Sequence, residues 1–197
     1  MAVGPAYHGS MDRPTTRRSA PTYLRLAPRP GDRGHICTGS VFRTERGTLT
    51  LTTVVLAYSH AAWAEFCFDE QDAVAGPVRV LEHAWAFFGG APRTWLFETL
   101  PPSIALDADV RGLARRCGAV ARRFRMADGV RWGEWALRAV PERLLRRHLL
   151  RDVGLANRLL GAFVDERLWR DHPAQRTRRV YELLDEERGQ LGPVGAP

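Results

Sequence analysis

Hydrophobic and polar residues alternate from Thr48 to Thr53, with leucines between threonines. This period of two predicts a β-strand with one buried face. The apolar run Val54–Leu56 continues the strand. Trp63, Phe66 and Phe68 then predict a second strand that pairs back on the first through a tight connection.

An apolar stripe with helical spacing follows these strands. Its members recur every three or four residues, which predicts a helix with one face in the core: Val74, Val78, Leu81, Trp85 and Phe88. Gly89-Gly90 should end this helix as a C-cap, and Pro92 should prevent its restart. Arg93–Phe97 has the composition of a buried strand. Strand, strand, helix and strand within about fifty residues predict a mixed sheet with a crossover connection.

The flanking segments carry further, shorter patterns. A strand is expected at 35–42 and another at 119–126, with a helix between Pro102 and Gly118. Amphipathic helices are expected at 138–150 and 155–168, and a short one around 180–184. His172, beside a proline, is interpreted as a turn residue.

Composition restricts the functional class. The 197 residues are 45% hydrophobic, which suits one globular domain, and no apolar run reaches membrane-spanning length. Three widely spaced cysteines fit no zinc motif and indicate a reducing compartment. The net charge is +7, and arginine supplies all 29 basic residues, which favours a polyanionic partner. Genomic base composition would explain the absence of lysine equally well.

Three segments, in this order, carry a resemblance to a known family: V-L-A-Y-S-H-A-A-W-A-E, E-H-A-W-A-F-F-G-G-A-P-R and L-F-E-T-L. They resemble the integrase-type catalytic core of the IstA-like insertion-sequence transposases, which work with an IstB-type ATPase helper. The resemblance runs from about residue 23 to 194. It implies an α/β, RNase H-like integrase core, with a mixed central sheet and flanking helices, plus a C-terminal helical extension.

Composition and the resemblance together imply a domain organisation. Residues 1–22 are expected to be a disordered N-terminal tail, 23–152 a degenerate integrase-like core, 153–190 the helical extension and 191–197 a frayed tail. Transposases of this family carry a helix-turn-helix region ahead of the core. The first 22 residues lack the length and pattern of such a region.

Three carboxylates hold two divalent metal ions in the family, and two of the three are missing from this sequence. The first position is Cys37, whose soft sulfur is a poor ligand for magnesium, and the third is Ala136, which cannot bind metal. Glu98 is the remaining candidate acid, expected on a strand beside that of Cys37. Without a first ligand, we interpret Glu98 as a solvated residue at a strand end. The sequence therefore predicts no metal site and no cofactor, with Mg²⁺ or Mn²⁺ required only if the site is active.

Arginines form the candidate nucleic-acid surface, since their side chains pair with phosphates. They are Arg115, Arg116, Arg122, Arg123, Arg125, Arg143, Arg146 and Arg147. A solvated helix end and strand face explains them equally well.

Three functions fit these patterns. The preferred one is a transposase-related protein of DNA transposition, catalytically inactive or truncated, that still binds DNA. The alternatives are an active metal-dependent DNA strand transferase, and a regulator that binds intact transposase or its IstB-type ATPase helper. All three place the protein in the cytoplasm without a membrane anchor.

Overall fold

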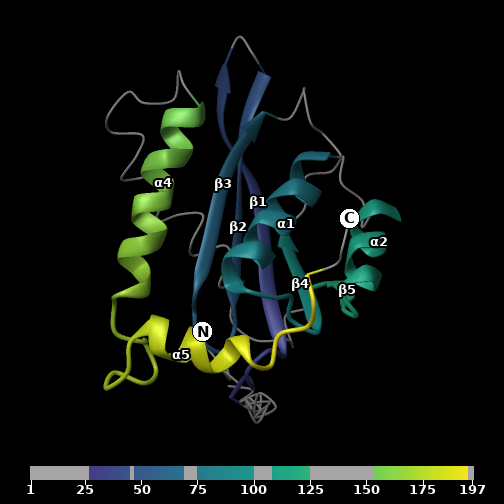
Figure 1. Ribbon diagram of the computed structural model, residues 1–197. Helices are drawn as coiled ribbons and strands as arrows, with labels where there is room; N and C mark the ends of the chain where they lie inside the picture. Colours follow the sequence, from purple (N-terminus) through teal and green to yellow (C-terminus); the bar gives the residue numbers. More distant parts are fainter. Residues whose placement is uncertain (1–26, 45–46, 69–74, 100–107, 125–152, 195–197) are drawn as a thin grey trace, which may run out of the picture.

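The computed structural model describes residues 27–44, 47–68, 75–99, 108–124 and 153–194 (Figure 1). The strands are β1 (Arg33–Thr44), β2 (Gly47–Leu56), β3 (Ala62–Phe68), β4 (Thr94–Thr99) and β5 (Val120–Arg123). The helices are α1 (Ala75–Phe88), α2 (Ala108–Arg116), α4 (Val153–Leu168) and α5 (Val180–Arg188). The predicted tail at 1–22 and the predicted helix at 138–150 lie outside the described residues.

The described strands form one mixed sheet in the order β3-β2-β1-β4-β5. β1, β2 and β3 run antiparallel as a meander, and β1, β4 and β5 run parallel. Helix α1 carries the chain from the edge strand β3 to β4, on the far side of β1. The mixed sheet with a crossover, predicted from the sequence, is therefore confirmed.

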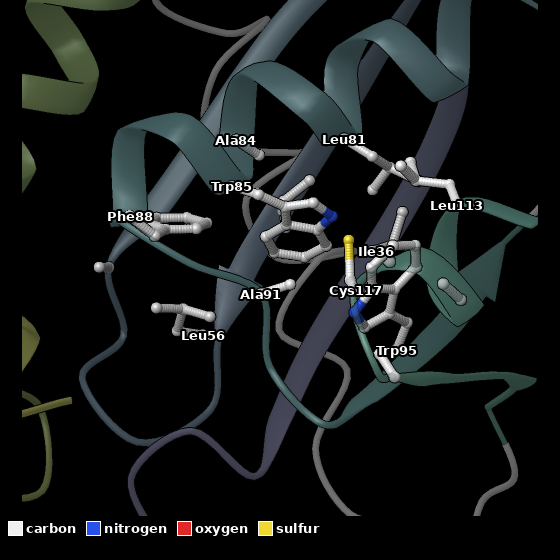
Figure 2. Close-up of a cluster of buried hydrophobic side chains, with 14 of the residues drawn as sticks. Ile36, Leu56, Leu81, Ala84, Trp85, Phe88, Ala91, Trp95, Leu113 and Cys117 are labelled. Atoms are coloured by element: carbon white, nitrogen blue, oxygen red, sulfur yellow. The ribbon is translucent and has the colours of Figure 1, made fainter. Parts of the chain in front are cut away.

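The main hydrophobic core lies between the sheet and α1 (Figure 2). Trp85 of α1 stands at its centre and is fully buried, with its ring centroid 5.0 Å from that of Trp95 in β4. Ile36, Val54 and Leu56 line the sheet side of this cluster. Such fully buried aromatic and aliphatic side chains supply most of the hydrophobic stabilisation of a domain.

The second face of the sheet is also covered, by α4 beside β3 (Figure 1). Ala156 and Leu160 of this helix pack on Leu49, Leu51 and Phe66. The period-two alternation in β2 is correct, but the expectation of only one buried face is wrong. Thr50 and Thr52, on the face opposite Leu49 and Leu51, are buried as well, because hydrophobic clusters lie on both sides of the sheet.

The C-terminal helix α5 belongs to the main core. Val180 and Leu184 lie in the same cluster as Trp85, although almost a hundred residues separate them in the sequence. After α5, Gly192 pairs with Ala91, donating to its carbonyl at 2.7 Å and accepting from its amide at 3.0 Å. This pairing joins the segment after α5 to the turn that follows α1.

The glycine pair after α1 has two separate roles. Gly89 ends the helix with a φ of 84°, as the predicted C-cap requires. Gly90 instead leaves room for the C-terminal segment, since a Cβ there would lie 2.6 Å from the Gly192 carbonyl oxygen. In the described part of the chain, none of the helices is long and apolar enough to cross a bilayer.

Candidate functional site at the junction of β1 and β4

Cys37 and Glu98 lie on neighbouring strands, as expected. Ile36 of β1 pairs with Phe97 of β4, and Cys37 pairs with Thr99, so Glu98 is an extra residue opposite the step between them. Such a bulge changes the direction in which a strand presents its side chains and often occurs beside functional sites. The irregular register therefore places Glu98 diagonally across from Cys37.

The carboxylate of Glu98 is paired with a histidine that the sequence reasoning missed. His35 Nδ1 lies 2.8 Å from Glu98 Oε1, and the exposed fractions of the two side chains are 3% and 0%. Because a carboxylate accepts hydrogen bonds only, the imidazole N–H is the donor. Interpreting Glu98 as a solvated strand-end residue is therefore wrong, since its side chain is buried and paired.

The same sheet face carries Cys37. Residues at i and i+2 of a strand share a face, so Cys37 follows His35 toward the same side of the sheet. Cys37 is 1% exposed, and its carbonyl accepts a hydrogen bond from the Thr53 hydroxyl at 3.4 Å. The ring of Phe124, just beyond β5, packs on His35 with centroids 5.9 Å apart. The two-residue spacing of His35 and Cys37 on a predicted strand is the signal that could have identified His35 from the sequence.

These donors do not fit a magnesium ion. Magnesium prefers an octahedral shell of oxygen ligands, several of them water, whereas Cys37 offers sulfur. Glu98 has no exposed side-chain surface and already accepts from His35. The third expected position, Ala136, lies outside the described residues. Within the described ranges, no three His, Cys, Asp or Glu side chains come together as a potential metal site.

The candidate arginine surface is partly described. Arg115 and Arg116 end α2, and Arg122 and Arg123 lie in the edge strand β5; all four are exposed. Arg116 also approaches Glu82 of α1, with Nη2 3.9 Å from Oε1. Arg122 and Arg123 are consecutive and so project to opposite faces of β5. The remaining candidates, Arg125, Arg143, Arg146 and Arg147, lie outside the described residues.

A second group of buried titratable side chains fastens the C-terminal segment to the turn after β2. His172 Nε2 donates to the Tyr58 carbonyl at 3.1 Å, and its Nδ1 accepts from the amides of Ala174 at 3.3 Å and Gln175 at 3.0 Å. The interpretation of His172 as a turn residue is confirmed, and the contact with Tyr58 adds a long-range role. Burial is the main cause that lowers the pKa of His172.

His60 and Glu187 complete this group. His60 has a φ of 59°, and its ring centroid lies 4.3 Å from that of His172. Burial, followed by the nearby His172 and Arg167, lowers the pKa of His60 to about 3. Glu187 accepts from the backbone amides of Gly31 at 3.0 Å and Ser59 at 3.1 Å, and burial raises its pKa.

No protein-family model and no curated protein matches the sequence. Solved structures do match. A chain in the simian T-cell lymphotropic virus intasome, in complex with PP2A regulatory subunit B56 gamma, superposes with a TM-score of 0.58 and 14% identity over 79% of this protein. The protein spans 54% of that chain, or about half its length.

Two structures of the HTLV-2 integrase catalytic core domain in complex with magnesium match over nearly their whole length. The dimeric form gives a TM-score of 0.55 at 10% identity, covering 79% of this chain and 95% of the other. The trimeric form gives 0.56 at 11% identity, covering 78% and 96%. At such identities the likeness establishes the fold. The protein has the RNase H-like α/β fold of the retroviral integrase catalytic core.

Proposed function

We propose that this protein is an IstA-like, transposase-related integrase-core protein that contacts DNA without catalysing strand transfer. The fold supports the relation to DNA integration, as do the three sequence segments that resemble the IstA-like family. The three cysteines form no disulfide, which supports a place in the reducing cytoplasm.

The main support for the absence of strand-transfer activity is the His35–Glu98 pair beside Cys37. Strand transfer of this type needs carboxylates that hold two metal ions at the attacking and leaving oxygens. Here a thiol stands at the first of the three expected positions, and the carboxylate at the second, Glu98, is buried against an imidazole at 2.8 Å. We therefore derive no metal-dependent catalytic step from these side chains.

The proposed DNA contact uses the arginines at the end of α2 and in β5. An arginine that pairs with a phosphate displaces condensed counterions, so binding weakens as salt rises. Arg122 and Arg123 are exposed at the open edge of the sheet, next to Val120, which is 62% exposed. Among the described residues, β5 pairs with β4 alone, so its other edge has no strand partner in this part of the chain.

Salt-dependent binding to duplex DNA tests this contact. We expect Arg122→Ala/Arg123→Ala to weaken binding and to reduce the slope of log Kobs against log salt concentration by about 1 to 2. The matched control is Arg158→Ala/Arg176→Ala, which removes the same charge from exposed positions elsewhere. Equal effects of both pairs, or no binding by the parent at low salt, would contradict the proposal.

A DNA nicking and joining assay with Mg²⁺ or Mn²⁺ tests the inactive character. We expect no product from the parent protein above a no-enzyme blank. An active parent together with an inactive Glu98→Ala variant would instead establish an active strand transferase.

One observation favours a second candidate function, that of a regulator binding intact transposase or its IstB-type ATPase helper. Trp169 is 62% exposed and packs against Tyr181 of α5 in a tilted arrangement, with ring centroids 4.9 Å apart. Exposed aromatic side chains are enriched at protein–protein interfaces. Co-purification with either partner, lost in Trp169→Ala, would support this function. A parent that captures neither partner would exclude it.

A further inference from the structure

Glu98 occupies the position at which the resemblance implies a metal ligand, but its partner is a hydrogen-bond donor from the chain itself. In a magnesium site the carboxylate oxygens point at the cation. Here Oε1 of Glu98 accepts from Nδ1 of His35 at 2.8 Å, and both side chains are almost completely buried. We propose that His35 takes the place of a divalent cation as the partner of Glu98 and makes the β1–β4 junction independent of metal. This inference rests on the proposed loss of the metal site.

A buried carboxylate requires such a partner. Moving an ionised carboxylate out of water costs several kcal/mol unless a donor or a counter-charge compensates it. In a metal enzyme the cation provides that compensation and can dissociate. A histidine two residues before Cys37 provides it from the chain itself, so the junction forms with the fold.

The surroundings hold the imidazole in place. His35 lies in the middle of the sheet, paired in register with Val55 of β2 and Leu96 of β4, and Phe124 packs on its ring. On β4, the bulge places Glu98 opposite the step between Ile36 and Cys37, next to His35. Both strands are interior, so neighbouring strands fix the backbone on either side of the pair.

The proposal has a specific consequence for restoring metal binding. Replacing Cys37 with aspartate supplies the missing hard ligand but leaves Glu98 engaged with His35. Cys37→Asp alone should therefore not create a manganese site. Cys37→Asp combined with His35→Ala removes the imidazole partner of Glu98 and should create one, since carboxylate oxygens suit Mn²⁺.

Thermal unfolding with and without millimolar MnCl₂ tests this consequence without any activity measurement. We expect no metal-dependent rise in Tm for the parent or for Cys37→Asp. Cys37→Asp/His35→Ala should gain about 3–6 °C, the effect of a ligand at roughly ten times its Kd on a domain of this size. Adding Glu98→Gln should abolish the gain. A gain in Cys37→Asp equal to that of the double variant, or no gain in either, would overturn the proposal.

A double-mutant cycle without metal gives a second measurement if the designed site fails to fold. His35→Ala leaves a buried carboxylate without its imidazole, so it should lower Tm more than His35→Ala/Glu98→Gln does. Strictly additive effects would overturn the proposal. A parent stabilised by Mn²⁺ would overturn both this inference and the proposed inactivity, whereas a parent that binds no DNA would overturn only the proposed function.

Discussion

The side-chain amide of Asn157 in α4 closes on the backbone of Phe66 in the edge strand β3. Phe66 N–H donates to Asn157 Oδ1 at 2.8 Å, and Asn157 Nδ2 donates to the Phe66 carbonyl at 3.1 Å. On its other side Phe66 stands in register with Leu51 of β2. The amide thus takes the place of a neighbouring strand at this position, and exposed strand edges are common sites of aggregation.

Asn157→Ala should destabilise the protein by about 1–3 kcal/mol, because it leaves two partly buried backbone groups without these partners. Urea unfolding measures this loss. Sedimentation of the folded variant should also show more self-association through the β3 edge. The neighbouring Arg158→Ala, at an exposed position of the same helix, should change stability by no more than about 0.5 kcal/mol. Indistinguishable behaviour of the two variants would contradict the edge-closing role.

The buried histidine pair predicts acid sensitivity. The folded pKa of His60 is lowered to about 3, and that of His172 is lowered too, relative to an unfolded value of 6.5. Below pH 6.5 the unfolded chain therefore binds more protons, so the contribution to stability is complete above that pH and decreases below it. For His60 the loss continues down to about pH 3, with a limiting slope of about 1.4 kcal/mol per pH unit.

His60→Asn isolates this effect, since asparagine tolerates the φ of 59° and does not titrate. The free energy of unfolding of the parent minus that of the variant should be constant above pH 7 and should fall as the pH decreases from 6.5 to 4. Glu187, whose pKa is raised by burial, contributes with the opposite sign, but it is present in both proteins and largely cancels. A difference that does not change with pH would show that His60 is not held neutral.

Local patterns predict the elements of this fold better than they predict its contacts. Alternation at 48–56 identifies β2, and the glycine pair correctly places the end of α1. The burial of Thr50 and Thr52, on the face of β2 opposite Leu49 and Leu51, was not predictable from this alternation. Burial on both faces depends on tertiary packing, which a strand pattern does not contain.

The candidate site shows the same limit. The resemblance identifies Cys37 and Glu98, and the structure places them on adjacent strands. The environment of Glu98 depends on the register between β1 and β4, and a slip of one residue would turn its side chain to the opposite face. The partner His35 lies 63 residues away in the sequence. A single sequence holds no signal for that register.

The close packing at Gly90 permits a matched pair of glycine substitutions. A Cβ at Gly90 would lie 2.6 Å from both the Gly192 carbonyl oxygen and the Leu191 Cβ, whereas a Cβ at Gly161 in α4 meets nothing within 4 Å. Gly90→Ala should therefore destabilise the protein by about 1–3 kcal/mol through overpacking. Gly161→Ala should stabilise it by about 0.5–1 kcal/mol, because alanine is the better helix former. Urea unfolding distinguishes the two signs. Limited proteolysis of Gly90→Ala should cleave first near residue 192, and cleavage there at the parental rate would contradict a role of Gly90 in seating the C-terminal segment.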